Sequence, residues 1–174
     1  MRLSKFFVIS YVVLGLVTVT ALWLICRPLY ILYVTDIDTQ KDVMVTRVTP
    51  GDNMWIVFIN SVEKLPVADH FVVNQEHELI FTETVYMAPY AGYTREKKVQ
   101  NVGPGTSRIH GYDRKMDKVT FFAGDISRHM LLWNGHWVSL YEVADGGDII
   151  EINIEAENLA QKWMEWVERS MFND

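Results

Sequence analysis

The feature that most constrains this chain is a run of 21 uncharged residues, from Phe6 to Cys26, rich in Val, Leu, Ile and Phe. A helix needs about 20 such residues to cross the hydrocarbon core of a bilayer. A cleaved signal peptide has a shorter apolar region and a cleavage site of small residues, which this segment lacks. We therefore expect residues 1–27 to form an uncleaved transmembrane signal anchor that contacts the lipid bilayer through residues 6–26.

Basic residues flank the apolar run unequally, and this predicts its orientation. Arg2 and Lys5 precede the run together with the α-amino group, whereas only Arg27 follows it closely. The end with more Lys and Arg stays in the cytoplasm. We expect a single-pass protein of the cytoplasmic (inner) membrane, with residues 28–174 in the periplasm or outside the cell.

After the anchor, the sequence changes to short β-type segments bounded by Gly, Asn, Asp and Pro. Val43–Val48 and Met54–Asn60 flank the turn sequence Pro50–Asn53, which predicts a β-hairpin. No helical crossover separates the segments, so we expect a mainly β domain, an antiparallel β-sandwich or a barrel-like fold. The other expected strands are Leu29–Val34, Ala68–Val73, Glu78–Tyr86, Val119–Ala123, Met130–Trp133, Trp137–Val143 and Ile149–Ile154.

Within this pattern, two details of the chain are specific enough to test. Alternation along residues 78–86 predicts one face with Leu79, Phe81 and Val85, and an opposite face with Ile80, Thr82, Thr84 and Tyr86. Hairpin-type turns are predicted at Asn134-Gly135 and Gly146-Gly147. The glycine-rich stretch 88–116 is expected to be irregular.

The last twenty residues have a different period. Leu159, Trp163, Trp166, Val167 and Met171 recur at helical spacing. Acidic residues at the start of this segment suit the positive end of a helix dipole. We expect a C-terminal amphipathic helix at about 155–172 that packs over an open end of the β domain or binds a partner.

Charge and the reactive residue types exclude several functions. The net charge of −6 argues against nucleic-acid binding. A locally basic stretch between Ala88 and Lys118 is either a solvated loop or a patch that faces anionic lipid, an acidic partner or an anionic ligand. Cys26 is the only cysteine, so neither an intramolecular disulfide nor a thiolate metal site can form. The five histidines lack metal-ligand spacing and no nucleophile motif is present, so we predict no catalytic residue, metal or cofactor.

The most distinctive motif is Ser61-Val62-Glu63-Lys64-Leu65-Pro66-Val67, followed by Glu83-Thr84 and then Tyr90-Ala91-Gly92. It resembles a bacterial family of unknown function with a His-Ser-Val-Glu-Lys-x-Pro-Val core, a later Glu-Thr pair and an aromatic-Gly-Ala-Gly stretch. Asn60 stands where that family usually has His. The resemblance spans about residues 29–154 and implies a small β-rich domain behind an N-terminal hydrophobic segment.

The resemblance also implies a partner. Such domains are often encoded beside, or linked to, tripartite ATP-independent periplasmic (TRAP) transporters of the TAXI subtype. Our leading hypothesis is therefore a membrane-anchored, non-enzymatic accessory or binding module that works with TRAP-type transporter subunits. Its expected contact residues are Asn60, Ser61, Glu63, Lys64, Asp69, Glu83, Tyr90 and Gly92.

Two other functions stay open. The domain could bind a small ligand in a β-barrel or sandwich pocket lined by Trp55, Trp133 and Trp137, although these side chains could equally belong to the core. It could also be an envelope hydrolase that uses Glu63 and Asp69 as an acid and base pair. Against this, the same two carboxylates could simply accept hydrogen bonds from backbone amides in the connection between two strands.

Overall fold

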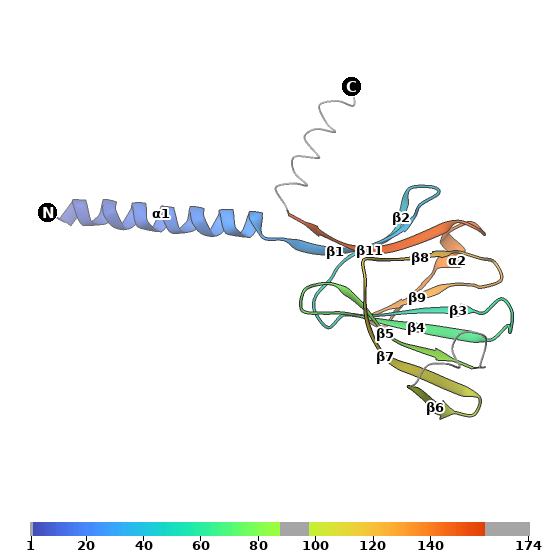
Figure 1. Cartoon of the computed structure of the whole chain (residues 1–174). Coiled ribbons are helices and arrows are strands. Elements are labelled where there is room, and N and C mark those ends of the chain that lie inside the picture. The colour runs from blue at the N-terminus through green and yellow to red at the C-terminus, as the bar shows by residue number, and fades with distance from the viewer. Residues whose placement is uncertain (1, 88–97, 159–174) are drawn as a thin grey trace, which may run out of the picture. The chain divides into compact units, whose positions relative to one another are not determined.

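The computed structural model describes residues 2–87 and 98–158 (Figure 1). Its first element is helix α1 (Arg2–Cys26), in which the segment Ile9–Cys26 is long and apolar enough to cross a membrane and has no buried residue. The hydroxyl groups of Thr18 and Thr20 donate hydrogen bonds to the carbonyls of Leu14 and Leu16, so these polar groups are satisfied inside the helix. The predicted helix is confirmed, and by composition it suits a membrane anchor or a signal sequence.

The segment Tyr30–Glu155 is a separate compact unit built from two antiparallel sheets (Figure 1). The smaller sheet has the strand order β2-β1-β11-β8. Its strands are β1 (Leu29–Asp36), β2 (Lys41–Arg47), β8 (Lys118–Phe122) and β11 (Ile149–Glu157). Strands from both ends of the domain therefore share one sheet.

The larger sheet has the order β10-β9-β3-β4-β5-β7-β6. Its strands are β3 (Asn53–Ile59), β4 (Pro66–Val73), β5 (Leu79–Tyr86), β6 (Val99–Gly103), β7 (Thr106–Met116), β9 (Met130–Trp133) and β10 (His136–Ser139). A one-turn helix, α2 (Leu140–Val143), follows β10. The expected mainly β, antiparallel sandwich is confirmed, and within the described residues the sheets do not close into a barrel.

The core lies between the two sheets and explains why they pack. Alternate side chains of β1 and β11 are buried on one side, and those of β3, β4, β5 and β9 on the other. Burial of these apolar side chains is the main stabilising contribution to the fold. The fully or nearly fully buried members are Leu32, Val34, Val48, Met54, Ile56, Phe71, Val73, Leu79, Ala123, Leu131, Trp133, Leu140, Ile150 and Ile152.

Two predicted hairpins are wrong because the chain changes sheet at these turns. Strand β2 pairs with β1, whereas β3 pairs with β4 and β9, so residues 50–53 connect the two layers. Gly146-Gly147 likewise leads from α2 to β11 in the other sheet. The turn at Asn134-Gly135 is a hairpin as predicted: both residues have positive φ, and β9 pairs with β10 across them.

Three further segments differ from expectation. Of the stretch 88–116 that was expected to be irregular, residues 99–116 form the hairpin β6–β7, in which Gly105 turns the chain with a φ of 69°. Residues 88–97 lie outside the described residues. The predicted strand 137–143 ends at Ser139, because Leu140 turns inward and is fully buried in the core. Strand β11 continues to Glu157, so the expected terminal helix does not begin at residue 155. The rest of that helix prediction, from residue 159, lies outside the described residues.

A β-bulge at Thr82 changes the predicted faces of β5. The pairing of β5 with β4 and with β7 shifts register between Phe81 and Glu83. One extra residue inverts the alternation beyond it. Leu79 and Phe81 face the core as predicted, but Thr84 and Tyr86 join them in place of Val85.

Candidate functional site

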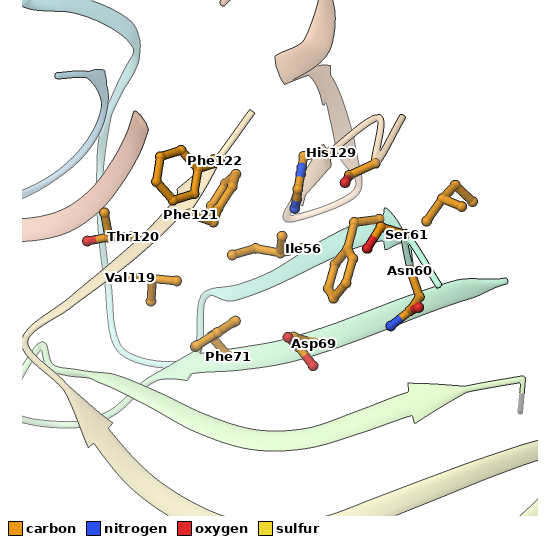
Figure 2. Close-up of a pocket in the computed structure, with 13 residues that line it drawn as sticks. Ile56, Asn60, Ser61, Asp69, Phe71, Val119, Thr120, Phe121, Phe122 and His129 are labelled. Carbon is orange, nitrogen blue, oxygen red and sulfur yellow. The ribbon is translucent and has the colours of Figure 1, made fainter. Parts of the chain in front are cut away.

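A cavity of about 410 Å³ lies between the two sheets, and we call it the inter-sheet cavity (Figure 2). Strand β8 of the smaller sheet contributes one wall, and β3 and β4 of the larger sheet contribute the other. The segments that follow β3 and precede β9 complete it. The lining residues are Ile56, Phe58, Ile59, Asn60, Ser61, Asp69, Phe71, Val119, Thr120, Phe121, Phe122, Ser127 and His129.

The β3–β4 loop, residues 60–65, closes one side of the cavity and contains the distinctive motif. The side-chain oxygen of Asn60 accepts hydrogen bonds from the backbone N–H groups of Val62 and Glu63, at 2.8 and 3.0 Å. The backbone N–H of Asn60 donates to Leu65, and that of Lys64, which has a φ of 57°, donates to Asn60. Asn60 therefore shapes the loop through its own side chain, as asparagine commonly does in turns.

Asp69 brings a carboxyl group to the inner face of β4. Its Oδ1 accepts a hydrogen bond of 2.6 Å from the hydroxyl of Thr84, which is fully buried on the neighbouring strand. The bulge at Thr82 is what turns Thr84 to this face. Burial raises the pKa of Asp69, and the hydrogen bond from Thr84 opposes this only in part.

His129 lies on the opposite side of the cavity from Asp69 (Figure 2). Its ring is stacked between Phe58 and Phe121, with ring centroids 5.1 and 4.6 Å apart, and only 8% of the residue is exposed. Burial lowers the pKa of His129 to about 4, so the imidazole is neutral at pH 7. Its Nδ1 is buried without a hydrogen-bond partner among the described residues, which is uncommon for a buried polar atom.

The structure brings only some of the predicted contact residues together. Asn60, Ser61 and Asp69 line the inter-sheet cavity. Glu63 and Lys64 are exposed on the β3–β4 loop and do not line it. Tyr90 and Gly92 lie outside the described residues.

Glu83, another of the predicted contact residues, is on the opposite face of the larger sheet from Asp69. It pairs with His70, the neighbour of Asp69, and adjacent residues of a strand point to opposite faces. There Glu83 forms an ion pair of 3.5 Å with Arg108, and His70 stacks on Trp55 at 4.1 Å. The motif pair Glu83-Thr84 thus contributes one side chain to each face.

The structure does not assemble either of the two alternative sites, the Glu63 and Asp69 pair or the pocket lined by tryptophans. Glu63 and Asp69 do not share a cleft, because Asp69 lines the cavity and Glu63 is on the exposed loop. None of the three predicted tryptophans lines the cavity: Trp133 is buried in the core, Trp55 covers His70, and Trp137 is 54% exposed. Phenylalanines supply the aromatic lining instead.

Three basic side chains in the described part of the basic stretch form ion pairs. Lys115 contacts Glu78 at 2.7 Å, and Lys118 contacts Glu151 at 2.6 Å. Together with Arg108 and Glu83, these pairs neutralise three of the basic side chains on the strands. Exposed pairs of this kind contribute little to stability, but they favour the interpretation of this stretch as a solvated surface.

Sequence reasoning missed His129, Thr84 and the phenylalanines of the cavity. His129 is isolated in the sequence, and nothing in its spacing separates it from the other histidines. Thr84 was assigned to the wrong face because a bulge leaves no clear mark in the sequence. Within residues 2–87 and 98–158, no group of three or more His, Cys, Asp or Glu side chains is placed to hold a metal ion.

Comparison with known proteins gives one match. The family model described as "Domain of unknown function (DUF1850)" matches residues 54–140, half of the 174-residue chain. The matched segment runs from β3 to α2 and includes every lining residue of the inter-sheet cavity. Neither the comparison with curated proteins nor that with solved structures gave a match.

Proposed function

The chain belongs to the DUF1850 family, a domain of unknown function, and from the geometry of its cavity we propose that it is a membrane-anchored, non-enzymatic module that binds a small molecule. The inter-sheet cavity supports this proposal. Its volume of about 410 Å³ falls within the range of small-molecule sites, which are mostly apolar with a few convergent polar groups. Phenylalanine and isoleucine side chains provide the apolar surface, and Asp69 and His129 provide the polar groups.

The carboxyl group of Asp69 is the single observation that most favours a binding role. It lines the cavity, burial raises its pKa, and its one side-chain hydrogen bond within the described residues comes from Thr84. A partly buried carboxylate is stabilised when a ligand supplies a further hydrogen-bond donor. The ring of His129 lines the same cavity, but its unpaired Nδ1 is itself buried and does not open onto it.

Filling the cavity should abolish binding. We expect the Val119→Phe variant, which places a ring in the cavity, to lose the affinity of the wild type for a neutral aromatic probe such as benzyl alcohol by at least about tenfold, or 1.4 kcal/mol. The full chain in lipid nanodiscs, with labelled isoleucine methyl groups, allows binding to be followed through the methyl signal of Ile56. Saturable shifts of that signal in the wild type are the expected result.

Val45→Phe is the matched control, because Val45 is an exposed valine of the smaller sheet and is 49% exposed. It should bind the probe as the wild type does. Absence of a saturable shift at Ile56 in the wild type, or equal binding by Val119→Phe, would contradict a small-molecule site in this cavity.

A transporter partner is the second part of the proposal, and the exposed β3–β4 loop favours it. Val62 is 79% exposed at the tip of this loop, beside Glu63 and Lys64, whereas Asn60 and Ser61 at its base line the cavity. A partner that contacts the tip would be adjacent to the bound ligand. We propose a TRAP-type transporter of the TAXI subtype as this partner, on the strength of the motif resemblance and the N-terminal apolar helix.

Affinity purification of the full chain from its native membrane in mild detergent tests the partner. Mass spectrometry should identify a transporter subunit with the wild type, and its recovery should fall at least about tenfold with Glu63→Ala, as for loss of a contact of roughly 1.4 kcal/mol. Glu76→Ala is the control, because Glu76 is exposed in the turn at the other end of β4. If no transporter subunit is recovered under any solute condition, the partner is wrong.

A further inference from the structure

The charge of the inter-sheet cavity indicates what kind of molecule it takes. Among the lining residues, all of which belong to the described part of the chain, Asp69 is the only one with a carboxyl group, none is a lysine or arginine, and His129 is neutral at pH 7. No lysine, arginine or histidine of the described residues forms an ion pair with it, and Thr84 donates its one side-chain hydrogen bond. A partly buried carboxylate without a counter-charge is unfavourable, and a cation in the cavity would compensate it.

The aromatic lining of the cavity is suited to the same charge. Phe58, Phe71, Phe121 and Phe122 surround the space with aromatic rings from both sheets. The face of an aromatic ring is electronegative and attracts a cation, by roughly 0.5–2 kcal/mol. These rings also provide apolar surface for the rest of the ligand.

His129 adds no charge repulsion. Its ring is neutral at pH 7 and is stacked between Phe58 and Phe121, so it extends the aromatic surface. Its unpaired Nδ1 is buried and does not open onto the cavity. Asp69 is therefore the group that requires a donor. An ammonium group has several N–H donors and a positive charge, whereas a carboxylate or phosphate has neither.

We propose that the inter-sheet cavity binds a small primary or secondary ammonium cation with an apolar body, whose nitrogen lies beside the Asp69 carboxylate. This inference rests on the proposed function and specifies its ligand class. The apolar body contacts the phenylalanine rings, and the N–H groups donate hydrogen bonds to Asp69.

Three probes of the same shape and different charge test the proposal. The full chain in phosphatidylcholine nanodiscs is titrated with benzylammonium, benzyl alcohol and benzoate at pH 7, again followed at the methyl signal of Ile56. Benzylammonium should bind at least about tenfold more tightly than benzyl alcohol, and benzoate should be the weakest. Equal or tighter binding of benzyl alcohol overturns the ammonium proposal while leaving the small-molecule site intact.

Asp69→Asn tests whether the preference comes from this carboxylate. The amide oxygen of asparagine can still accept the hydrogen bond from Thr84, so the strand pairing is retained. The variant should bind benzyl alcohol as the wild type does and lose its preference for benzylammonium. The control Glu76→Gln removes one charge from an exposed turn and should keep that preference.

The three probes and the Asp69→Asn variant separate the ammonium proposal from the broader proposal of a small-molecule site. A preference for the cation that survives in Asp69→Asn overturns the role of Asp69. If none of the three probes binds the wild type, the small-molecule function fails together with the inference. If Asp69→Asn does not fold, the comparison of the three probes on the wild type still tests the preference for an ammonium cation.

Discussion

Acidification from pH 7 to pH 4 should lower the free energy of unfolding of the wild type by roughly 3 kcal/mol more than that of the His129→Phe variant. Burial lowers the pKa of His129 to about 4, below the value of 6.5 for an unperturbed histidine. The unfolded chain therefore takes up the proton first as pH falls through 6.5, and the folded state loses stability until pH reaches about 4. One pKa unit corresponds to about 1.4 kcal/mol, which gives the expected magnitude.

Asp69 contributes to the pH dependence of the free energy of unfolding with the opposite sign to His129. The effect of His129 is therefore measured as the difference between the wild type and the His129→Phe variant. Burial raises the pKa of Asp69, so the folded state is penalised at neutral pH and relieved as pH falls through that raised value. This contribution is present in both proteins and cancels in the comparison. Phenylalanine at position 129 can occupy the same space between Phe58 and Phe121 without titrating.

Urea unfolding of the full chain in nanodiscs, followed by tryptophan fluorescence at pH 7 and pH 4, measures this difference. His136→Gln is the control, because His136 is exposed on the adjacent hairpin strand. It should behave as the wild type does. The same pH dependence in His129→Phe and in the wild type would mean that His129 is not buried in the folded domain.

Leu131→Ala should lower the free energy of unfolding by about 2–5 kcal/mol, the usual cost of truncating a fully buried leucine. Leu131 has no exposed surface and is paired with Ile56 on β3 and Val138 on β10. It belongs to the core cluster shared with Leu32 and Ile150 of the smaller sheet. Its loss therefore tests whether the two sheets pack on one another, and it removes a large part of the stability of an ordinary domain.

The same urea experiment at pH 7 provides the measurement. Val62→Ala is the matched control, because Val62 is 79% exposed at a loop tip, and it should change the unfolding free energy by no more than about 0.5 kcal/mol. If Leu131→Ala costs less than about 1 kcal/mol, the two sheets do not share the core described above.

The N-terminal helix and most strands could be predicted because their signals are local. A run such as Phe6–Cys26 is too apolar for any other exposed structure, and strands such as Met130–Trp133 were predicted with their exact bounds. The hairpin turn at Asn134-Gly135 could also be predicted, because both positions need a positive φ and these two residue types adopt it readily. The edge strand β6 and its neighbour β7 were missed because their sequences lack apolar alternation.

A small part of the candidate site was also visible in the sequence. The motif directed attention to Asn60, Ser61 and Asp69, which do line the cavity. It also suggested Glu83, which points to the other face, because the motif does not reveal which side of a strand faces the core. His129 entered the site from a segment about 60 residues away, and only the pairing of β9 with β3 brings it there.

The sequence by itself determined the elements: an apolar helix, short antiparallel strands and the turns whose residues require an unusual backbone. Only the tertiary structure decided which strands pair, where the chain crosses between sheets, and which side chains meet in the cavity. The physical reason is that helix and turn preferences depend on neighbouring residues, whereas the partners of a strand are set by how distant apolar faces bury one another. A one-residue bulge at Thr82 was enough to turn Thr84 toward Asp69 and so to complete the polar side of the site.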